Sequence, residues 1–217
     1  MRPSEPPLIS RLRARLTDGS PLPGPAAQAR MAHQRRGDYG GAGAGARRAA
    51  VLALLYPRSG TADDLLLLFI QRTSPPGDRH AGQISFPGGS ADPGDPSAEY
   101  TARRELEEEV GVAAESVNVL GALSPLFIPV SNFLVEPFVG YLPERPRLRP
   151  QPSEVARTLE LPLADFSRPE NRVLLDKTLT SGLRLTGVPH YRVGGVDIWG
   201  ATAMMTSELV SLLNAAP

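Results

Sequence analysis

The segment from Ala102 to Val112 limits the possible folds of this chain more than any other, because acidic and apolar residues recur there at helical spacing. Successive helical residues are about 100° apart, which places three carboxylates within one sector roughly 100° wide: Glu105, Glu108 and Glu109. An adjoining apolar stripe can pack the same helix against a sheet: Ala102, Leu106 and Val110. We therefore expect a helix that holds three neighbouring anions at the rim of a sheet contact.

Neighbouring carboxylates repel one another and raise one another's proton affinity. A divalent cation removes that conflict, and hard oxygen ligands suit Mg²⁺ or Mn²⁺, which also bridge to substrate phosphates. The alternative is a solvated helix with ion pairs between successive turns, which is the commoner meaning of an acidic helix. Here Gly88 and Gly89 follow an apolar strand and a proline, where glycine lets a carbonyl approach a cation closely. The combination favours a metal site.

Apolar runs and turn residues predict strands on both sides of this helix. The expected strands cover 49–56, 65–71, 83–86, 117–123, 134–142, 161–166 and 196–200. Helices are expected over 97–110, between the cap Ser97 and Gly111, and over 206–213, with Thr206 as the cap. Pro137 would place its strand at a sheet edge or at a bulge.

Residues 1–46 are predicted to form a basic, Pro- and Gly-rich arm in front of one domain over 47–217. Through residue 48 the chain has nine arginines against three acidic residues. Helical spacing of leucines predicts a short amphipathic helix in the arm: Leu8, Leu12 and Leu16. Residues 20–27 and 37–45 are expected to be linkers.

Charge argues against nucleic acid as the main partner. Twenty-three basic and twenty-three acidic residues cancel, which removes the bulk positive field that such binding uses. The arm could contact RNA or an acidic membrane surface, but Lys177 is the sole lysine, so the arginine excess also reflects overall composition. Nucleic-acid binding is therefore not expected.

The chain has no cysteine, which excludes a disulfide framework, a thiolate nucleophile and a cysteine zinc site. His33, His80 and His190 are too dispersed to indicate a zinc cluster. The longest apolar runs, 49–56 and 65–70, are far shorter than the roughly 20 residues of a membrane helix. The first residues lack the apolar stretch of a secretory signal. We expect a cytoplasmic protein that uses oxygen ligands.

The glycine and acidic helix together resemble the signature of the Nudix hydrolases, which runs Gly, five residues, Glu, seven residues, then Arg-Glu-apolar-x-Glu-Glu-x-Gly-apolar. The matching positions are Gly89, Arg104, Glu105, Leu106, Glu108, Glu109, Gly111 and Val112. Asp95 stands where the family has glutamate, and one extra residue precedes Arg104. The resemblance implies an α/β fold, an α/β/α sandwich around a mixed sheet.

Further residues resemble the coenzyme A pyrophosphatase branch of this family: Arg72, Gly82, Gln83, Phe86, Pro87, Gly88 and Asp92. The resemblance implies metal-dependent hydrolysis of the pyrophosphate bond of coenzyme A or its thioesters, giving 3′-phosphoadenosine 5′-phosphate and (acyl-)4′-phosphopantetheine. Metal ions would neutralise the pyrophosphate and lower the pKa of the attacking water. The cofactor would be Mg²⁺ or Mn²⁺.

The resemblance also implies a role for each residue that matches the signature. Glu105, Glu108 and Glu109 would bind metal with the Gly89 carbonyl, and Arg104 would brace the carboxylates or the loop. The general base stays open between Glu108, Glu109 and the distal Glu154.

Four residues are candidates for substrate binding: Arg72, Arg79, His80 and Gln83. Arginine suits the extra 3′-phosphate of coenzyme A, although ordinary loop contacts are as good an interpretation. Phe86 and Trp199 could flank an adenine, but core packing is the favoured interpretation.

Two rival functions remain. One is hydrolysis of another nucleoside diphosphate derivative, such as NADH, ADP-ribose or a damaged nucleoside triphosphate. The other is a non-catalytic ligand-sensing domain whose arm binds RNA. A homodimer is possible without any sequence argument for it.

Overall fold

The computed structural model describes residues 5–33, 43, 45–59, 64–73, 82–179 and 182–214. Within them the α-helices are α1 (Pro7–Thr17), α2 (Gly24–Ala29), α3 (Ala98–Val110) and α4 (Gly200–Asn214). Strands of the larger sheet are β1 (Arg47–Pro57), β2 (Leu65–Arg72), β3 (Ile84–Ser85), β4 (Gly88–Ser90), β5 (Asn118–Ala122), β6 (Leu126–Ile128), β7 (Phe133–Tyr141) and β8 (Val155–Pro162). A smaller sheet comprises β9 (Arg172–Thr178), β10 (Arg184–Val193) and β11 (Val196–Trp199). Short 3₁₀ helices cover Ala114–Ser116, Leu163–Ser167 and Pro169–Asn171.

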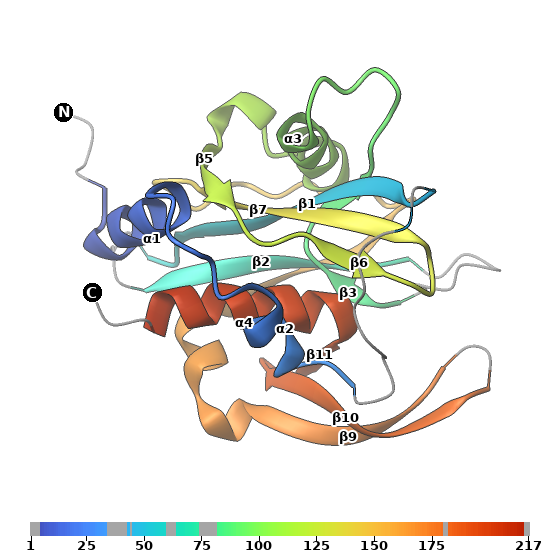
Figure 1. Ribbon diagram of the computed structural model, residues 1–217. Coiled ribbons are helices and arrows are strands. Elements are labelled where there is room, and N and C mark those ends of the chain that lie inside the picture. Colours follow the sequence, from blue (N-terminus) through green and yellow to red (C-terminus); the bar gives the residue numbers. More distant parts are fainter. Residues whose placement is uncertain are drawn as a thin grey trace.

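The larger sheet is mixed, with the strand order β3-β2-β1-β7-β5 and with β8 beside β2, β4 beside β1 and β6 beside β7. Strands β1 and β7 run parallel, and the other pairs are antiparallel. Helix α3 covers one face of the sheet and α4 covers the other (Figure 1). The predicted α/β/α sandwich with a mixed sheet is confirmed.

Strand β1 is apolar at nearly every position because helices cover both faces of the sheet. Alternate side chains therefore enter different cores. Leu54 joins the cluster under α3 together with Leu106. Leu55 joins the cluster around α4 together with Leu209. All four side chains are fully buried, so the long apolar run of the sequence marks a central strand.

The smaller sheet packs on the α4 side of the molecule. The ring of Tyr191 on β10 meets Phe166 edge-on, with centroids 5.3 Å apart. Phe69 and Phe86 stack in the same core at 4.9 Å, so Phe86 packs in the interior as the sequence favoured. Strand β9 was not predicted, because its residues alternate between exposed and half-buried and form no apolar run.

Helix α1 confirms the prediction from the leucine spacing, and it buries Ile9 and Leu12 in the same core as β7 and α4. Residues 24–27, which were expected in a linker, instead belong to α2. Hydrogen bonds to a buried carboxylate of α4 hold this segment in place. The carboxylate of Glu208, fully buried, accepts hydrogen bonds from Gly24 N at 3.1 Å and from Gln28 Nε2 at 2.9 Å. Most of the linker expected over 37–45 lies outside the described residues.

The edge or bulge position predicted from Pro137 is wrong. Strand β7 lies inside the sheet, with β1 on one side and β5 and β6 on the other. Pairing with β6 ends at Val135 and pairing with β5 begins at Phe138, so the proline faces the junction of its two partners. Its carbonyl accepts from Leu123 N at 2.8 Å. The missing N–H therefore falls where no ladder bond is needed.

Two other expected boundaries are corrected. Helix α4 begins at Gly200, and Thr206 lies within it, with its Oγ1 donating to Thr202 O at 2.8 Å. The strand expected over 161–166 is the end of β8 followed by a 3₁₀ helix. In the part of the chain described, no helix has the length and apolarity to cross a membrane.

Candidate active site

Helix α3 forms where the sequence predicted it. The Ser97 side chain caps its start by accepting from Tyr100 N at 3.1 Å. Gly111, at φ 70°, ends it in the left-handed conformation that glycine adopts most easily. The apolar stripe is buried on β1, which leaves the carboxylate sector beside β4.

The two glycines of β4 are required for different reasons. Gly88 has φ 150°, and a Cβ there would lie 2.3 Å from Ala50 O on the paired strand β1. A Cβ on Gly89 would instead lie 2.5 Å from the carboxylate carbon of Glu105. Gly88 therefore permits the backbone pairing, and Gly89 makes room for the Glu105 carboxylate.

Glu109 is the most buried carboxylate of the site, at 1% exposed. Its Oε2 accepts from Gly88 N at 2.8 Å. Its Oε1 accepts no hydrogen bond from the described residues and lies 3.8 Å from Nη1 of Arg72. Burial raises the pKa of Glu109 to about 8, although the Gly88 N–H and Arg72 oppose the rise. An additional positive charge at Oε1 would stabilise the anion.

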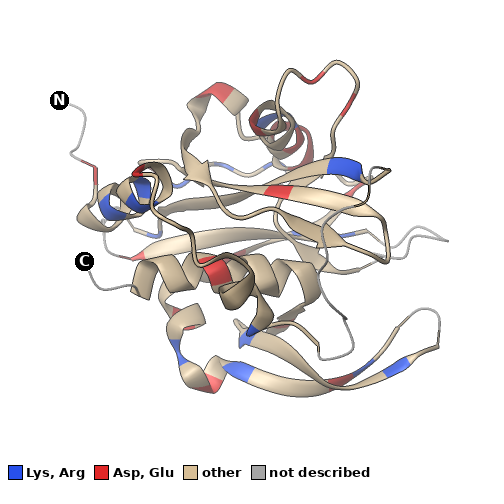
Figure 2. Ribbon diagram, in the orientation of Figure 1, with Lys and Arg blue, Asp and Glu red and all other residues tan. Residues whose placement is uncertain are grey.

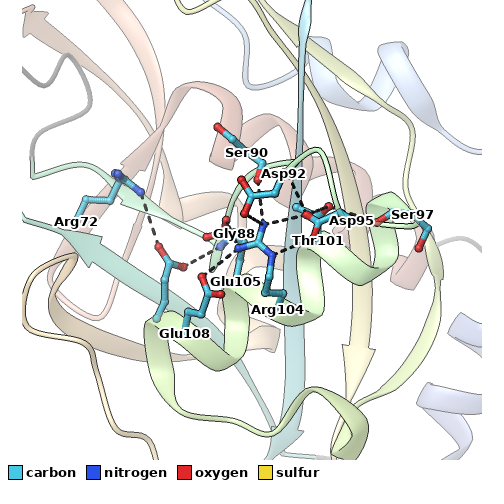
Figure 3. A network of polar contacts seen from close by, with 11 residues as sticks. Arg72, Gly88, Ser90, Asp92, Asp95, Ser97, Thr101, Arg104, Glu105 and Glu108 are labelled. Atoms are coloured by element: carbon cyan, nitrogen blue, oxygen red, sulfur yellow. Dashed lines mark hydrogen bonds and ion pairs between the residues drawn. The ribbon is translucent and has the colours of Figure 1, made fainter.

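Arg104 joins the loop before α3 to the carboxylates, and the network is drawn in Figure 3. Its Nη1 donates to Glu105 Oε1 and to Glu108 Oε2, each at 3.0 Å. Its Nη2 donates to Asp95 Oδ2 at 2.9 Å and to Ser90 O at 3.1 Å. The predicted bracing role of Arg104 therefore has direct contacts to both the loop and the helix.

Asp95 is an anchor for Arg104 that the sequence analysis did not identify. The Arg104 guanidinium lowers the pKa of Asp95 to about 2. Thr101 Oγ1 donates to the same carboxylate at 2.8 Å, and Asp92 N donates at 3.1 Å. The sequence did offer one signal for this role: Asp95 is an acidic residue at the position before the helix where the Nudix signature has glutamate.

The neighbouring carboxylates differ in environment. Burial raises the pKa of Glu105, and Arg104 opposes that rise while Glu108 and Glu154 add to it. Glu108 is more open, with 56% of its side chain exposed. The repulsion predicted between neighbouring anions therefore acts on Glu105, and Arg104 offsets part of it.

The donor set fits a divalent cation in its chemistry. Among the described residues, no three His, Asp or Glu side chains already enclose a metal-sized position. Glu105 and Glu108 instead share one nitrogen of Arg104. The buried Glu109 oxygen without a hydrogen bond is the observation that fits a cation, because an isolated anion there is costly. Carboxylates of this kind are the ligands that Mg²⁺ and Mn²⁺ take.

Of the predicted substrate-binding residues, Arg72 ends β2, and its Nη1 forms an ion pair with Glu109. Figure 3 shows the Arg72 side chain pointing toward the carboxylates of α3. Gln83 lies beside it, and its carbonyl accepts from Arg72 N at 3.0 Å. Arg79 and His80 fall outside the described residues. The structure thus brings Arg72 to the carboxylates, and it places Gln83 beside Arg72 through a backbone hydrogen bond.

The candidate base Glu154 follows a turn that is attached to α3. Gln151 N donates to Glu109 O at 2.9 Å, and Arg149 N donates to Val110 O at 2.7 Å. Glu154 O accepts from Thr73 N at 2.9 Å, beside Arg72. The charge of Glu154 raises the pKa of Glu105 and Glu109, so a fourth carboxylate acts on this site.

Trp199 lies away from these carboxylates on the smaller sheet. Its ring is stacked on His190, with centroids 6.1 Å apart, and Lys177 Nζ lies 5.1 Å from the ring centroid. Both neighbours come from the same sheet, which supports the packing interpretation of Trp199.

A model of the NUDIX domain matches residues 46–179, which include β4, the loop and α3. The chain belongs to the Nudix hydrolases. Members of this family act on pyrophosphate bonds and generally need divalent metal ions. The carboxylate helix and its glycine turn lie within the matched residues and form the candidate active site.

Three relatives extend the comparison. The human protein named mitochondrial coenzyme A diphosphatase NUDT8 is 36% identical over 176 residues, covering 79% of this chain and 74% of its own length. The Nudix hydrolase NudL of Photorhabdus laumondii is 47% identical over 142 residues, covering 65% of this chain and 74% of its own. NudL of Yersinia enterocolitica is 40% identical over 152 residues, covering 68% of this chain and 74% of its own length. The family resemblance read from the sequence is confirmed.

Proposed function

We propose that this Nudix hydrolase cleaves the pyrophosphate bond of coenzyme A or acyl-coenzyme A. Water attacks a phosphorus, the anhydride P–O bond breaks, and the products are 3′-phosphoadenosine 5′-phosphate and (acyl-)4′-phosphopantetheine. The proposal of metal-dependent chemistry rests on the buried carboxylate of Glu109, whose Oε1 accepts no hydrogen bond in the part of the chain that the structure describes. The similarity to human NUDT8 supports coenzyme A as the substrate.

The residues of α3 and β4 would supply the site. Glu105, Glu108, Glu109 and the Gly89 carbonyl would hold Mg²⁺ or Mn²⁺. When bound there, such an ion neutralises pyrophosphate charge and lowers the pKa of the attacking water. Arg104 fixes the Glu105 carboxylate, and fixed positions account for most catalysis of phosphoryl transfer.

Arg72 would bind the substrate. Its guanidinium lies 3.8 Å from Glu109, so a pyrophosphate oxygen bound near that carboxylate would come within reach of the arginine fork. The base that accepts the proton of the attacking water is Glu108, Glu109 or Glu154, and Glu154 is the candidate outside α3.

A substrate panel tests the proposal directly. Purified protein with Mg²⁺ or Mn²⁺ is incubated separately with coenzyme A, acetyl-coenzyme A, NADH, ADP-ribose and oxidised nucleoside triphosphates, and the products are identified by mass. We expect the two named products from coenzyme A. Brisk cleavage of another compound with none of coenzyme A would refute the substrate assignment.

A variant tests the metal ligand. Glu109→Gln keeps the size of the side chain and removes its charge, so turnover should fall by orders of magnitude while the circular dichroism spectrum is unchanged. Turnover close to that of the unaltered protein would show that Glu109 is not a ligand. Parallel titrations with Mg²⁺ and Mn²⁺ identify the preferred ion.

We also propose a cytoplasmic location, in keeping with a sequence that contains no cysteine and therefore no disulfide framework. Fractionation of cells that produce the chain under its own promoter tests it. Enrichment in a membrane-bounded compartment would refute it.

A further inference from the structure

Strand β9 is the outer edge of the smaller sheet, at the bottom of Figure 1. Within the described residues it pairs with β10 alone. An edge strand presents unpaired backbone groups that can join another strand. Leu174, in the middle of β9, is 69% exposed, which is unusual for a large apolar side chain in a strand.

The register shows which backbone groups of β9 point outward. Leu174 lies opposite Pro189, which has no N–H to donate. At the end of the strand, Leu179 N donates to Leu183 O at 2.9 Å, so odd-numbered residues direct their backbone groups to β10. The N–H and C=O groups of Arg172, Leu174 and Asp176 therefore point away from β10, to the open edge.

The side chains of the same three residues share one face of the strand, because side chains alternate with period two. All three are exposed. We call Arg172, Leu174 and Asp176 the β9 strip. Charges of both signs are visible along this sheet in Figure 2. Along the strip a basic residue, Arg172, is followed by the apolar Leu174 and then by the acidic Asp176.

This order is complementary to itself. If two copies of β9 pair antiparallel about a twofold axis at Leu174, Arg172 faces Asp176 of the other copy twice, and leucine faces leucine. The outward backbone groups of the strip then exchange hydrogen bonds across the axis. A register centred on Leu175 would place Leu174 opposite aspartate, and one centred on Val173 would place it opposite arginine. Only the Leu174 register matches charges and apolar side chains.

We propose that β9 is the interface of a homodimer, in which a second copy of this chain extends the smaller sheet about a twofold axis at Leu174. The partner is a second copy of this chain, because the charges of the β9 strip pair with opposite charges when an identical strip lies antiparallel to it. This interface lies outside the carboxylate site, so the proposal does not depend on the substrate.

Charge-reversed variants test the pairing by sedimentation of the full chain over a range of concentrations. The unaltered protein should dimerise, and Arg172→Asp or Asp176→Arg should each raise the dimer dissociation constant about tenfold or more. Mixing the two variants should restore dimerisation, because each reversed charge then meets its opposite in the other chain. Thermal melts check folding, since Asp176 also accepts from Arg184 at 2.9 Å.

A crosslink tests the axis itself. The chain has no cysteine, so Leu174→Cys introduces one thiol per copy. Residues facing each other in a hydrogen-bonded antiparallel pair have Cα atoms about 5.5 Å apart, within the range of a disulfide. Oxidation should convert Leu174→Cys to a covalent dimer, and Val130→Cys, at 67% exposed, is the matched control. A monomeric unaltered protein, or equal crosslinking of both variants, would overturn the proposal.

Discussion

The glycine pair of β4 allows the fold and the site to be perturbed separately. Gly88→Ala places a Cβ 2.3 Å from Ala50 O and 2.6 Å from Val51 Cα, both of them backbone atoms of β1 that cannot rotate away. It also imposes a side chain on a φ of 150°. Backbone strain and overpacking each cost about 1–3 kcal/mol, so we expect a loss of about 2–6 kcal/mol in the free energy of unfolding.

Gly89→Ala meets a different neighbour. Its Cβ would lie 2.5 Å from the end of the Glu105 side chain, which can rotate away, and its φ is not positive. Stability should therefore change by about 1 kcal/mol or less. The displaced carboxylate leaves its place in the site, and a shift of about 1 Å in a reacting geometry can cost about 100-fold in rate. We expect at least that loss in kcat/KM.

Urea unfolding and steady-state hydrolysis of coenzyme A with Mg²⁺ measure both quantities. Gly94→Ala is the control, because it lies in the same region with open space at its Cβ and should match the unaltered protein in both assays. If Gly89→Ala kept full activity, or if Gly88→Ala were as stable as Gly94→Ala, the assignment of separate roles to the two glycines would be wrong.

Three further predictions concern charged groups. The pKa of Glu109 is about 8 in the folded protein and 4.5 in the unfolded chain. Without metal, the folded protein therefore loses stability as the pH rises from 4.5 to 8, because the buried carboxyl must give up its proton. Glu109→Gln should raise the urea midpoint of the metal-free protein above that of the unaltered protein at about pH 9, and leave it unchanged at about pH 4. Asp95→Asn should lower kcat about 10- to 100-fold by loosening Arg104, with the pH profile measured against Glu107→Gln, a residue of α3 whose carboxylate instead accepts from Ala114 N, and an unchanged kcat would contradict the anchor role. Glu208→Ala leaves the N–H groups of Gly24 and Ser124 without their acceptor and removes one of the two acceptors of Gln28 Nε2, so it should cost about 3 kcal/mol or more in unfolding free energy, which an unchanged thermal midpoint would refute.

The local features of the site could be predicted from sequence because they depend on residues a few positions apart. Ser97, Gly111 and the spacing of Glu105, Glu108 and Glu109 determine the helix and its carboxylate face with little help from the rest of the chain. The central strands were predicted because burial on both faces leaves an unbroken apolar run.

Features that depend on distant residues could not be predicted. Glu208 meets Gly24 and Gln28 from more than 170 positions away, and no local pattern marks such a partnership. Pro137 is tolerated inside a sheet only because two short strands meet opposite it. Strand β9 is half exposed, so its sequence resembles a loop until β10 pairs with it.

The hydrogen bonds from Arg149 and Gln151 to the end of α3 close a long excursion of the chain, which leaves that helix at Gly111 and returns to it after β7. Because the return point is fixed, the turns at 129–132 and 143–147, which lie outside β5, β6 and β7, can change in length without moving the carboxylates of α3, as long as those two amides remain. Insertions in these two turns should therefore be tolerated far better than a single deletion between 149 and 154.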